Sequence, residues 1–302
     1  MKIGNSDLDV HRLNLGGNVF GWTADEQESF AVLDAYAAAG GNFIDTADSY
    51  SDGGSETIIG NWLAKRGNRD DVVIATKVGN AAARPGLSAK NIRAAAEDSL
   101  RRLQTDHIDL YYAHRDLADA PLEETLGAFD ELVRAGKVRF LGASNFSADR
   151  LAEALSISDS SGFARFVALQ PHYNLVERAY ETDLLPLVQR EGLSTLPYFA
   201  LAKGFLTGKY RSRETDTGSP RAARAVEYLD HRGERVLEAL DDISAAHKTS
   251  PAAVAIAWLA SRPTVAAPIA SARNVGQLAD LLASVELELS AAELGSLDEA
   301  SS

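Results

Sequence analysis

The chain has 302 residues, of which 45% are hydrophobic and 24% charged, a composition typical of a globular protein with a sizeable core. Its formal net charge of −13 argues against a basic surface for nucleic acid or for an anionic membrane. The absence of cysteine excludes disulfides, thiolate metal sites and cysteine nucleophiles, so any redox chemistry must use a bound cofactor.

Neither terminus nor any internal segment predicts insertion into a membrane. No run approaches the roughly 18 consecutive apolar residues of a membrane-spanning helix, and the first residues lack the apolar stretch of a signal peptide. We therefore expect a cytoplasmic protein with no membrane partner.

Short apolar runs alternate with segments of helical period along the chain, which predicts parallel strands joined by helical crossovers. After a small N-terminal hairpin, strands are expected at 12–16, 41–45, 72–76, 108–113, 138–143, 166–170, 194–199 and 264–269. These strands fit an α/β fold of the closed (β/α)8 TIM-barrel type. Since no linker or change in composition divides the chain, we expect residues 1–302 to form one domain.

Capping signals predict where the intervening helices begin. Helix starts are indicated at Ser55, Ser88, Pro121, Ser147 and Ser250, and a capping box at Ser290 predicts a short C-terminal helix. The stretch 206–233 has no clear period, as is typical of lids and binding loops.

Polar side chains stand where predicted strands end. Asp45 closes one strand, Tyr50 follows five residues later, and Lys77 and His114 close the next two strands. Each has a structural explanation of its own, as a turn cap, a packing residue or a solvated strand end. In a parallel barrel, however, the carboxyl ends of all strands share one face, and barrel enzymes place their active sites there.

Together these four side chains could deliver a proton to a carbonyl group that is being reduced. The oxygen gains negative charge as hydride reaches the carbon, so it needs a positioned acid. A phenol is a poor donor at neutral pH, but a neighbouring ammonium lowers its pKa, and a carboxylate keeps that ammonium charged. Asp45, Lys77 and Tyr50 would form this relay, and His114 would orient the substrate oxygen.

Several segments carry a resemblance to a known family. They are 41–50 (GNFIDTADSY), 53–56 (GGSE), 75–79 (ATKVG), 111–115 (YYAHR), 121–125 (PLEET) and 141–146 (LGASNF). In this order they resemble the motifs of the aldo-keto reductases, and the resemblance covers nearly the whole chain. It implies NADPH-dependent reduction of aldehydes or ketones, with Asp45, Tyr50, Lys77 and His114 as the catalytic tetrad.

The resemblance also implies cofactor contacts. Ser144, Asn145 and Gln170 would hold the nicotinamide carboxamide, and Tyr198 would stack on the ring. The remaining implied contacts are Leu201, Lys203, Gly204, Leu206 and Lys209 at the pyrophosphate, Ser271 and Arg273 at the adenosine 2′-phosphate, and Gln277 and Asp280 at the adenine. The chain departs from the family pattern at Phe199, Ala200 and Leu281.

The 2′-phosphate contact is why we expect NADP(H) rather than NAD(H), since the fork of an arginine can grip a phosphate with two hydrogen bonds. A Rossmann domain is not expected, because no Gly-x-Gly-x-x-Gly follows a strand. The 6 histidines form no His-x-x-x-His pair, so no metal site is expected either. Phe20 and Trp22 are candidates for an apolar wall of the substrate pocket, or for packing.

Alternative functions remain open at this point. The same barrel could serve as a cofactor-sensing regulatory or binding subunit, as some members of the family do in channels. The same residues could also run a sugar or alcohol dehydrogenase in the oxidative direction. Fold alone does not distinguish these functions.

Overall fold

The computed structural model describes residues 1–212 and 222–302. Within them, eight parallel strands form one sheet in the order β10-β1-β2-β3-β6-β7-β8-β9. The strands are β1 (Asn14–Gly16), β2 (Phe43–Asp45), β3 (Val73–Val78), β6 (Ile108–Ala113), β7 (Val138–Ser144), β8 (Phe166–Gln170), β9 (Ser194–Thr195) and β10 (Ile269–Ala270). A parallel bridge between Thr195 and Val265 closes the sheet. The expected (β/α)8 barrel is confirmed.

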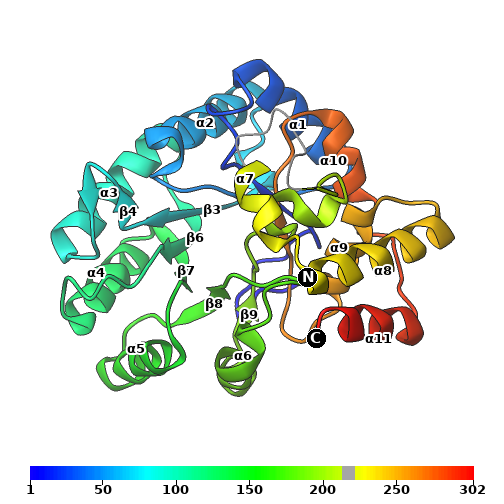
Figure 1. Cartoon of the computed structure of the whole chain (residues 1–302). Coiled ribbons are helices and arrows are strands. Elements are labelled where there is room, and N and C mark those ends of the chain that lie inside the picture. Colours follow the sequence, from blue (N-terminus) through cyan, green and yellow to red (C-terminus); the bar gives the residue numbers. More distant parts are fainter. Residues whose placement is uncertain (213–221) are drawn as a thin grey trace.

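Helices surround the strands (Figure 1). The α-helices are α1 (Glu26–Ala38), α2 (Gly54–Arg66), α3 (Ala89–Leu103), α4 (Leu122–Arg134), α5 (Ala148–Ser161), α6 (Tyr180–Glu191), α7 (Ala222–Ala225), α8 (His231–His247), α9 (Pro251–Ala260), α10 (Val275–Leu282) and α11 (Ala291–Ala300). Short 3-10 helices are η1 (Tyr50–Gly53), η2 (Arg69–Asp71), η3 (Ala202–Thr207) and η4 (Val226–Tyr228). A small hairpin of β4 (Asn80–Ala81) and β5 (Arg84–Pro85) follows β3.

The last two barrel strands are much shorter than the sequence pattern predicted. Runs 194–199 and 264–269 contribute only the two-residue strands β9 and β10. Pro197 and Pro268 lie inside these runs, and proline has no N–H to donate to a ladder. The backbone nevertheless stays in register, since the N–H of Ile269 donates to the carbonyl of Pro197 at 2.9 Å.

Two apolar clusters stabilise the barrel. The larger lies between the strands and the helices. The smaller fills the barrel interior and includes Phe43, Leu110 and Tyr112. The N-terminal segment joins this smaller cluster through Ile3, Leu8 and Val10. The expected N-terminal hairpin is therefore present in reduced form, closed by one antiparallel bridge between Lys2 and Asp9.

Most of the predicted helix starts are confirmed. Ser88, Ser147, Ser250 and Ser290 each accept a hydrogen bond from the backbone of the first turn. The predicted cap at Ser55 is wrong, because α2 begins at Gly54 after Gly53, whose φ is 87°. The Ser55 hydroxyl instead turns inward and donates to the carbonyl of Gly17 at 2.8 Å.

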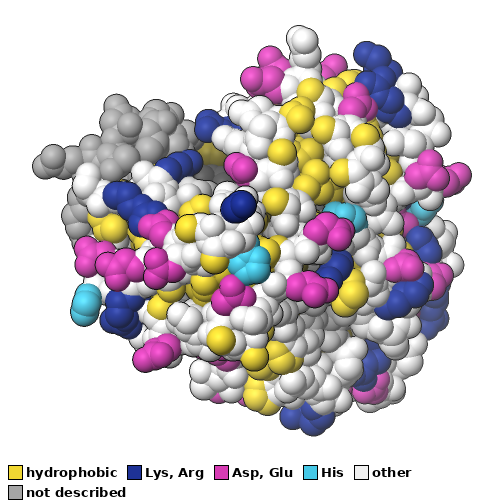
Figure 2. Space-filling view, turned by 90° about the vertical axis from the view of Figure 1, so that its right-hand side faces the viewer, with side chains coloured by type: hydrophobic (Ala, Val, Ile, Leu, Met, Phe, Trp, Pro, Cys, Tyr) yellow, Lys and Arg dark blue, Asp and Glu magenta, His cyan; other side chains and the backbone are white. Residues whose placement is uncertain are grey.

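The aperiodic stretch 206–233 includes α7 and η4, and residues 213–221 lie outside the part of the chain that the structure describes. No helix of the described residues is long and apolar enough to cross a membrane. On the face drawn in Figure 2, positive and negative side chains are interspersed.

Candidate active site

Neighbouring strands bring the predicted catalytic side chains to one end of the barrel. Asp45 is the last residue of β2, Lys77 lies near the end of β3, and His114 follows β6 directly. Register places Asp45 opposite Ala75, and Lys77 opposite Tyr112. Paired residues of parallel strands point to the same side of the sheet, and Lys77 lies two residues beyond Ala75. Asp45 and Lys77 therefore both point into the barrel.

Lys77 is fully buried and contacts both predicted partners. Its Nζ donates to Asp45 Oδ2 at 2.6 Å, to the carbonyl of Thr46 at 2.7 Å and to the Tyr50 hydroxyl at 3.3 Å. Burial opposes the charge of this ammonium, yet the carboxylate of Asp45 and the oxygen of Tyr50 outweigh burial and raise the pKa of Lys77. The side chain is therefore a charged ammonium at neutral pH.

The second carboxylate oxygen of Asp45 is also engaged. Gln170, at the end of β8, donates to Asp45 Oδ1 through Nε2 at 2.8 Å. Both oxygens of the buried carboxylate thus have partners, which satisfies the requirement that a buried charge be paired and hydrogen-bonded. This arrangement fixes the direction in which Lys77 presents its remaining proton to Tyr50.

His114 supplies a neutral imidazole beside Tyr50. The two rings meet edge to face, with centroids 6.1 Å apart. Burial, with further contributions from Lys77 and Arg115, lowers the pKa of His114 to about 3. The Nδ1 atom is buried and has no hydrogen-bond partner among the described residues. At neutral pH this side chain can donate one N–H without carrying charge.

A cavity of about 570 Å³ opens over these groups. Of the residues that the sequence predicts for the site, those lining it are Trp22, Asp45, Tyr50, His114, Ser144, Asn145, Gln170, Tyr198, Leu201, Lys203, Gly204, Lys209, Ser271, Arg273, Gln277 and Asp280. Lys77 lies buried beneath it. Leu206 and Phe20 are fully buried and do not line it, so Phe20 packs in the core, whereas Trp22 is 53% exposed at the cavity.

Hydrogen bonds connect the residues implied for the carboxamide. The Tyr198 hydroxyl donates to Asn145 Oδ1 at 2.8 Å, and Asn145 Nδ2 donates to Ser144 Oγ at 3.0 Å. Ser144 in turn donates to the carbonyl of Gln170 at 2.9 Å. His172 stacks on the Tyr198 ring, with centroids 5.2 Å apart and planes 12° from parallel. The position of the Tyr198 ring is therefore fixed by contacts at its hydroxyl and on its face.

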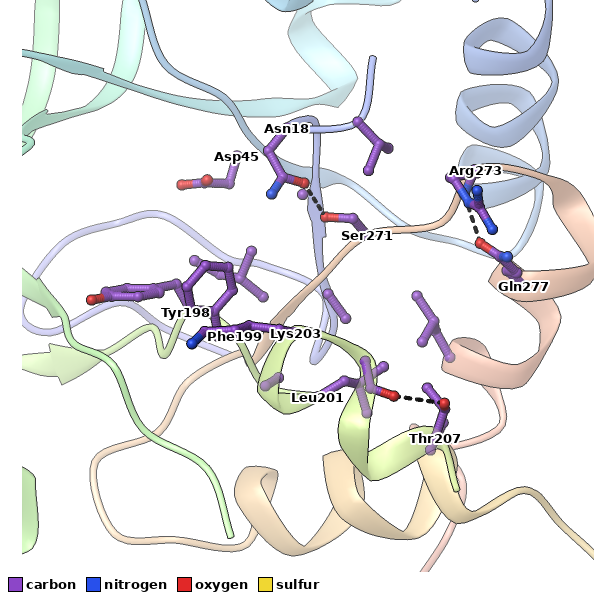
Figure 3. Close-up of a pocket in the computed structure, with 18 of the residues that line it drawn as sticks. Asn18, Asp45, Tyr198, Phe199, Leu201, Lys203, Thr207, Ser271, Arg273 and Gln277 are labelled. Carbon is purple, nitrogen blue, oxygen red and sulfur yellow. Dashed lines mark hydrogen bonds between the residues drawn. The ribbon is translucent and has the colours of Figure 1, made fainter. Parts of the chain in front are cut away.

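Figure 3 shows the rest of the cavity, where Arg273 and Gln277 approach from the side of α10. The N–H of Arg273 donates to Gln277 Oε1 at 3.0 Å, and Ser271 donates to Asn18 Oδ1 at 2.6 Å. Lys203 and Lys209 also line this cavity. Together, the cationic side chains of Lys203, Lys209 and Arg273 around this cavity are a donor set that fits a dinucleotide phosphate. The residues present therefore fit a nicotinamide dinucleotide.

Sequence reasoning missed several residues that line the cavity, among them Gly16, Asn18 and Arg115. A Cβ on Gly16 would lie 2.5 Å from the Ser271 hydroxyl, so a side chain there would displace Ser271. Asn18 follows the end of β1 and Arg115 follows the end of β6, so their place after a strand was a signal that could have found them. In residues 1–212 and 222–302, no cluster of His, Asp and Glu side chains could hold a metal ion.

Comparisons with known proteins agree with this architecture. The model of the "Aldo/keto reductase family" matches residues 12–302. The chain is 37% identical to the uncharacterized oxidoreductase YrpG of Bacillus subtilis, over 95% of this chain and 91% of that protein. It is 32% identical to norsolorinic acid reductase of Aspergillus flavus, over 91% and 72% of the two chains. It is 34% identical to a probable voltage-gated potassium channel subunit beta of Oryza sativa, over 95% and 90%. The chain belongs to the aldo/keto reductase family.

Proposed function

We propose that this protein is an NADP(H)-dependent reductase that converts aldehydes or ketones to alcohols. The observation that carries the proposal is the buried Lys77 ammonium, held between Asp45 and Tyr50 beneath the cavity. This lysine is fully buried at the carboxyl end of the barrel strands, and its partners are a carboxylate and a phenol. A buried charge held in this way beneath a cavity indicates a functional site in that cavity.

In this mechanism Tyr50 is the general acid. Its hydroxyl gives a proton to the carbonyl oxygen as that oxygen gains negative charge. Lys77, 3.3 Å from the phenolic oxygen, stabilises the phenolate that results. Asp45 keeps Lys77 charged, and the neutral imidazole of His114 donates a hydrogen bond that orients the carbonyl oxygen.

When bound, the nicotinamide cofactor supplies the hydride. Ser144, Asn145 and Gln170 would bind its carboxamide, and Tyr198 would provide a flat surface for the ring. Lys203, Lys209 and Arg273 would bind its phosphates, of which Arg273 would take the 2′-phosphate that distinguishes NADPH from NADH.

The test follows oxidation of NADPH at 340 nm with 4-nitrobenzaldehyde as substrate. Tyr50→Phe should lower kcat by about 10²- to 10⁴-fold, the usual contribution of a general acid. Tyr111→Phe is the matched control, because the Tyr111 hydroxyl is buried, does not line the cavity and has no hydrogen-bond partner in the described residues. Its kinetics should equal those of the native protein. Full activity of Tyr50→Phe would refute the mechanism.

A second candidate function is a cofactor-sensing binding subunit, which the similarity to a probable potassium channel subunit favours. In that case the native protein would bind NADPH, seen as quenching of tryptophan fluorescence, yet oxidise it with no carbonyl compound. The oxidative direction is tested in the same assay with NADP⁺ and 4-nitrobenzyl alcohol. A larger kcat/KM in that direction would favour a dehydrogenase.

A further inference from the structure

Arg115 is a cation at the catalytic end of the cavity, and the mechanism proposed above does not use it. It directly follows His114 and lines the same cavity as His114 and Tyr50. Its side chain is exposed. Within the part of the chain that the structure describes, no side chain forms an ion pair or hydrogen bond with its guanidinium.

The carboxylates of the same loop are engaged elsewhere. Asp116 accepts from Arg150 through Nε at 2.7 Å and Nη2 at 3.2 Å. Asp119 accepts from the N–H of Leu87 at 3.1 Å. Neither carboxylate neutralises Arg115, although Asp116 is its neighbour in sequence.

The ionisable groups of the proposed catalytic relay beside Arg115 carry no net charge between them. Lys77 is paired with Asp45 at 2.6 Å. His114 is neutral at physiological pH, because burial and then Lys77 and Arg115 lower its pKa to about 3. Arg115 therefore brings uncompensated positive charge next to the group that would orient the carbonyl oxygen.

We propose that Arg115 binds a carboxylate carried by the carbonyl substrate, so that the preferred substrates are aldehydes or ketones with a carboxylate a few atoms from the carbonyl. A guanidinium matches a carboxylate with two parallel charge-assisted hydrogen bonds. The chain as a whole carries −13 and does not attract anions, so recognition of an anionic substrate requires a local cation of this kind. This inference rests on the proposed function.

The experiment compares 3- and 4-carboxybenzaldehyde with their methyl esters, in the native protein, Arg115→Gln and Arg12→Gln. The two isomers place the carboxylate at two different distances from the carbonyl group. The quantity compared is the ratio of kcat/KM for acid over ester, since intrinsic reactivity cancels between variants. Arg12, the matched control, is exposed, lies before β1 at the other end of the strand and does not line the cavity.

For at least one isomer, the acid-to-ester ratio should fall roughly 10- to 100-fold in Arg115→Gln, mainly through KM, the range expected for hydrogen bonds to a charged group. The acid-to-ester ratio should stay unchanged in Arg12→Gln. Added salt should lower this ratio in the native protein, because salt screens the attraction between charges. An equal ratio in native protein and Arg115→Gln for both isomers, with the esters reduced, would overturn the inference and leave the proposed function intact. Reduction of neither acid nor ester would overturn both.

Discussion

Asp48 is a buried carboxyl group whose replacement by Asn should stabilise the protein at alkaline pH. It lies between Asp45 and Tyr50 in the sequence, is 7% exposed, and its Oδ1 has no hydrogen-bond partner among the described residues. Burial, together with the nearby carboxylate of Glu56, raises the pKa of Asp48 to about 7, although Arg102 and Lys77 oppose the shift. Above that pH the folded protein holds a poorly compensated buried charge.

The size of the effect follows from linkage. The folded-state pKa of about 7 exceeds the ordinary value of 3.8, so the unfolded chain loses this proton first as pH rises. The fold therefore favours the neutral carboxyl of Asp48. This contribution to the free energy of unfolding is fully present below pH 3.8 and is lost as pH rises from 3.8 to about 7. Each pH unit in that window costs about 1.4 kcal/mol, so the native protein should lose about 2 kcal/mol relative to Asp48→Asn between pH 5.5 and pH 8.5.

Urea unfolding followed by circular dichroism at pH 5.5 and pH 8.5 measures this difference. The free energy of unfolding of Asp48→Asn minus that of the native protein should grow with pH. Asp71→Asn, at an exposed carboxyl, is the control and should show no such growth. A gap that is constant or shrinks as pH rises would refute the assignment of a neutral Asp48 in the fold.

Three further predictions concern packing, the buried ion pair and the cofactor. Gly60→Ala should lower the free energy of unfolding by about 1–3 kcal/mol, because the added Cβ would lie 2.1 Å from a backbone oxygen of α3. Gly295→Ala has open space around the added Cβ and should raise the free energy of unfolding by about 0.5–1 kcal/mol. The same urea titration measures both. Lys77→Met should cost roughly 3–5 kcal/mol, since it leaves the Asp45 carboxylate buried without its ion-pair partner, and a loss below 1 kcal/mol would contradict this pairing. Arg273→Gln should raise the Kd of NADPH about tenfold or more in fluorescence titrations and change the Kd of NADH little. If the binding of both cofactors weakened equally, the assignment of Arg273 to the 2′-phosphate would be wrong.

The amino-acid sequence by itself determined the alternation of strands and helices, most helix starts and the position of polar residues at strand ends. These features depend on residues close together in the chain. Ser88, for example, caps its helix through the N–H of Asn91, three residues away. The pattern of apolar runs likewise places Asp45 and His114 at strand ends, and parallel strands then bring them to one face.

Only the tertiary structure decided which of these side chains have partners. Gln170 reaches Asp45 across 125 residues of sequence, and no local pattern predicts that contact. Phe20 and Trp22 lie two residues apart, yet one is in the core and the other faces the cavity. The uncompensated charge of Arg115 likewise depends on Arg150 of α5, which binds Asp116 in the loop after β6. Burial and pairing are set by segments that meet only when the barrel closes, because the free energy of a charge or a ring depends on everything packed around it.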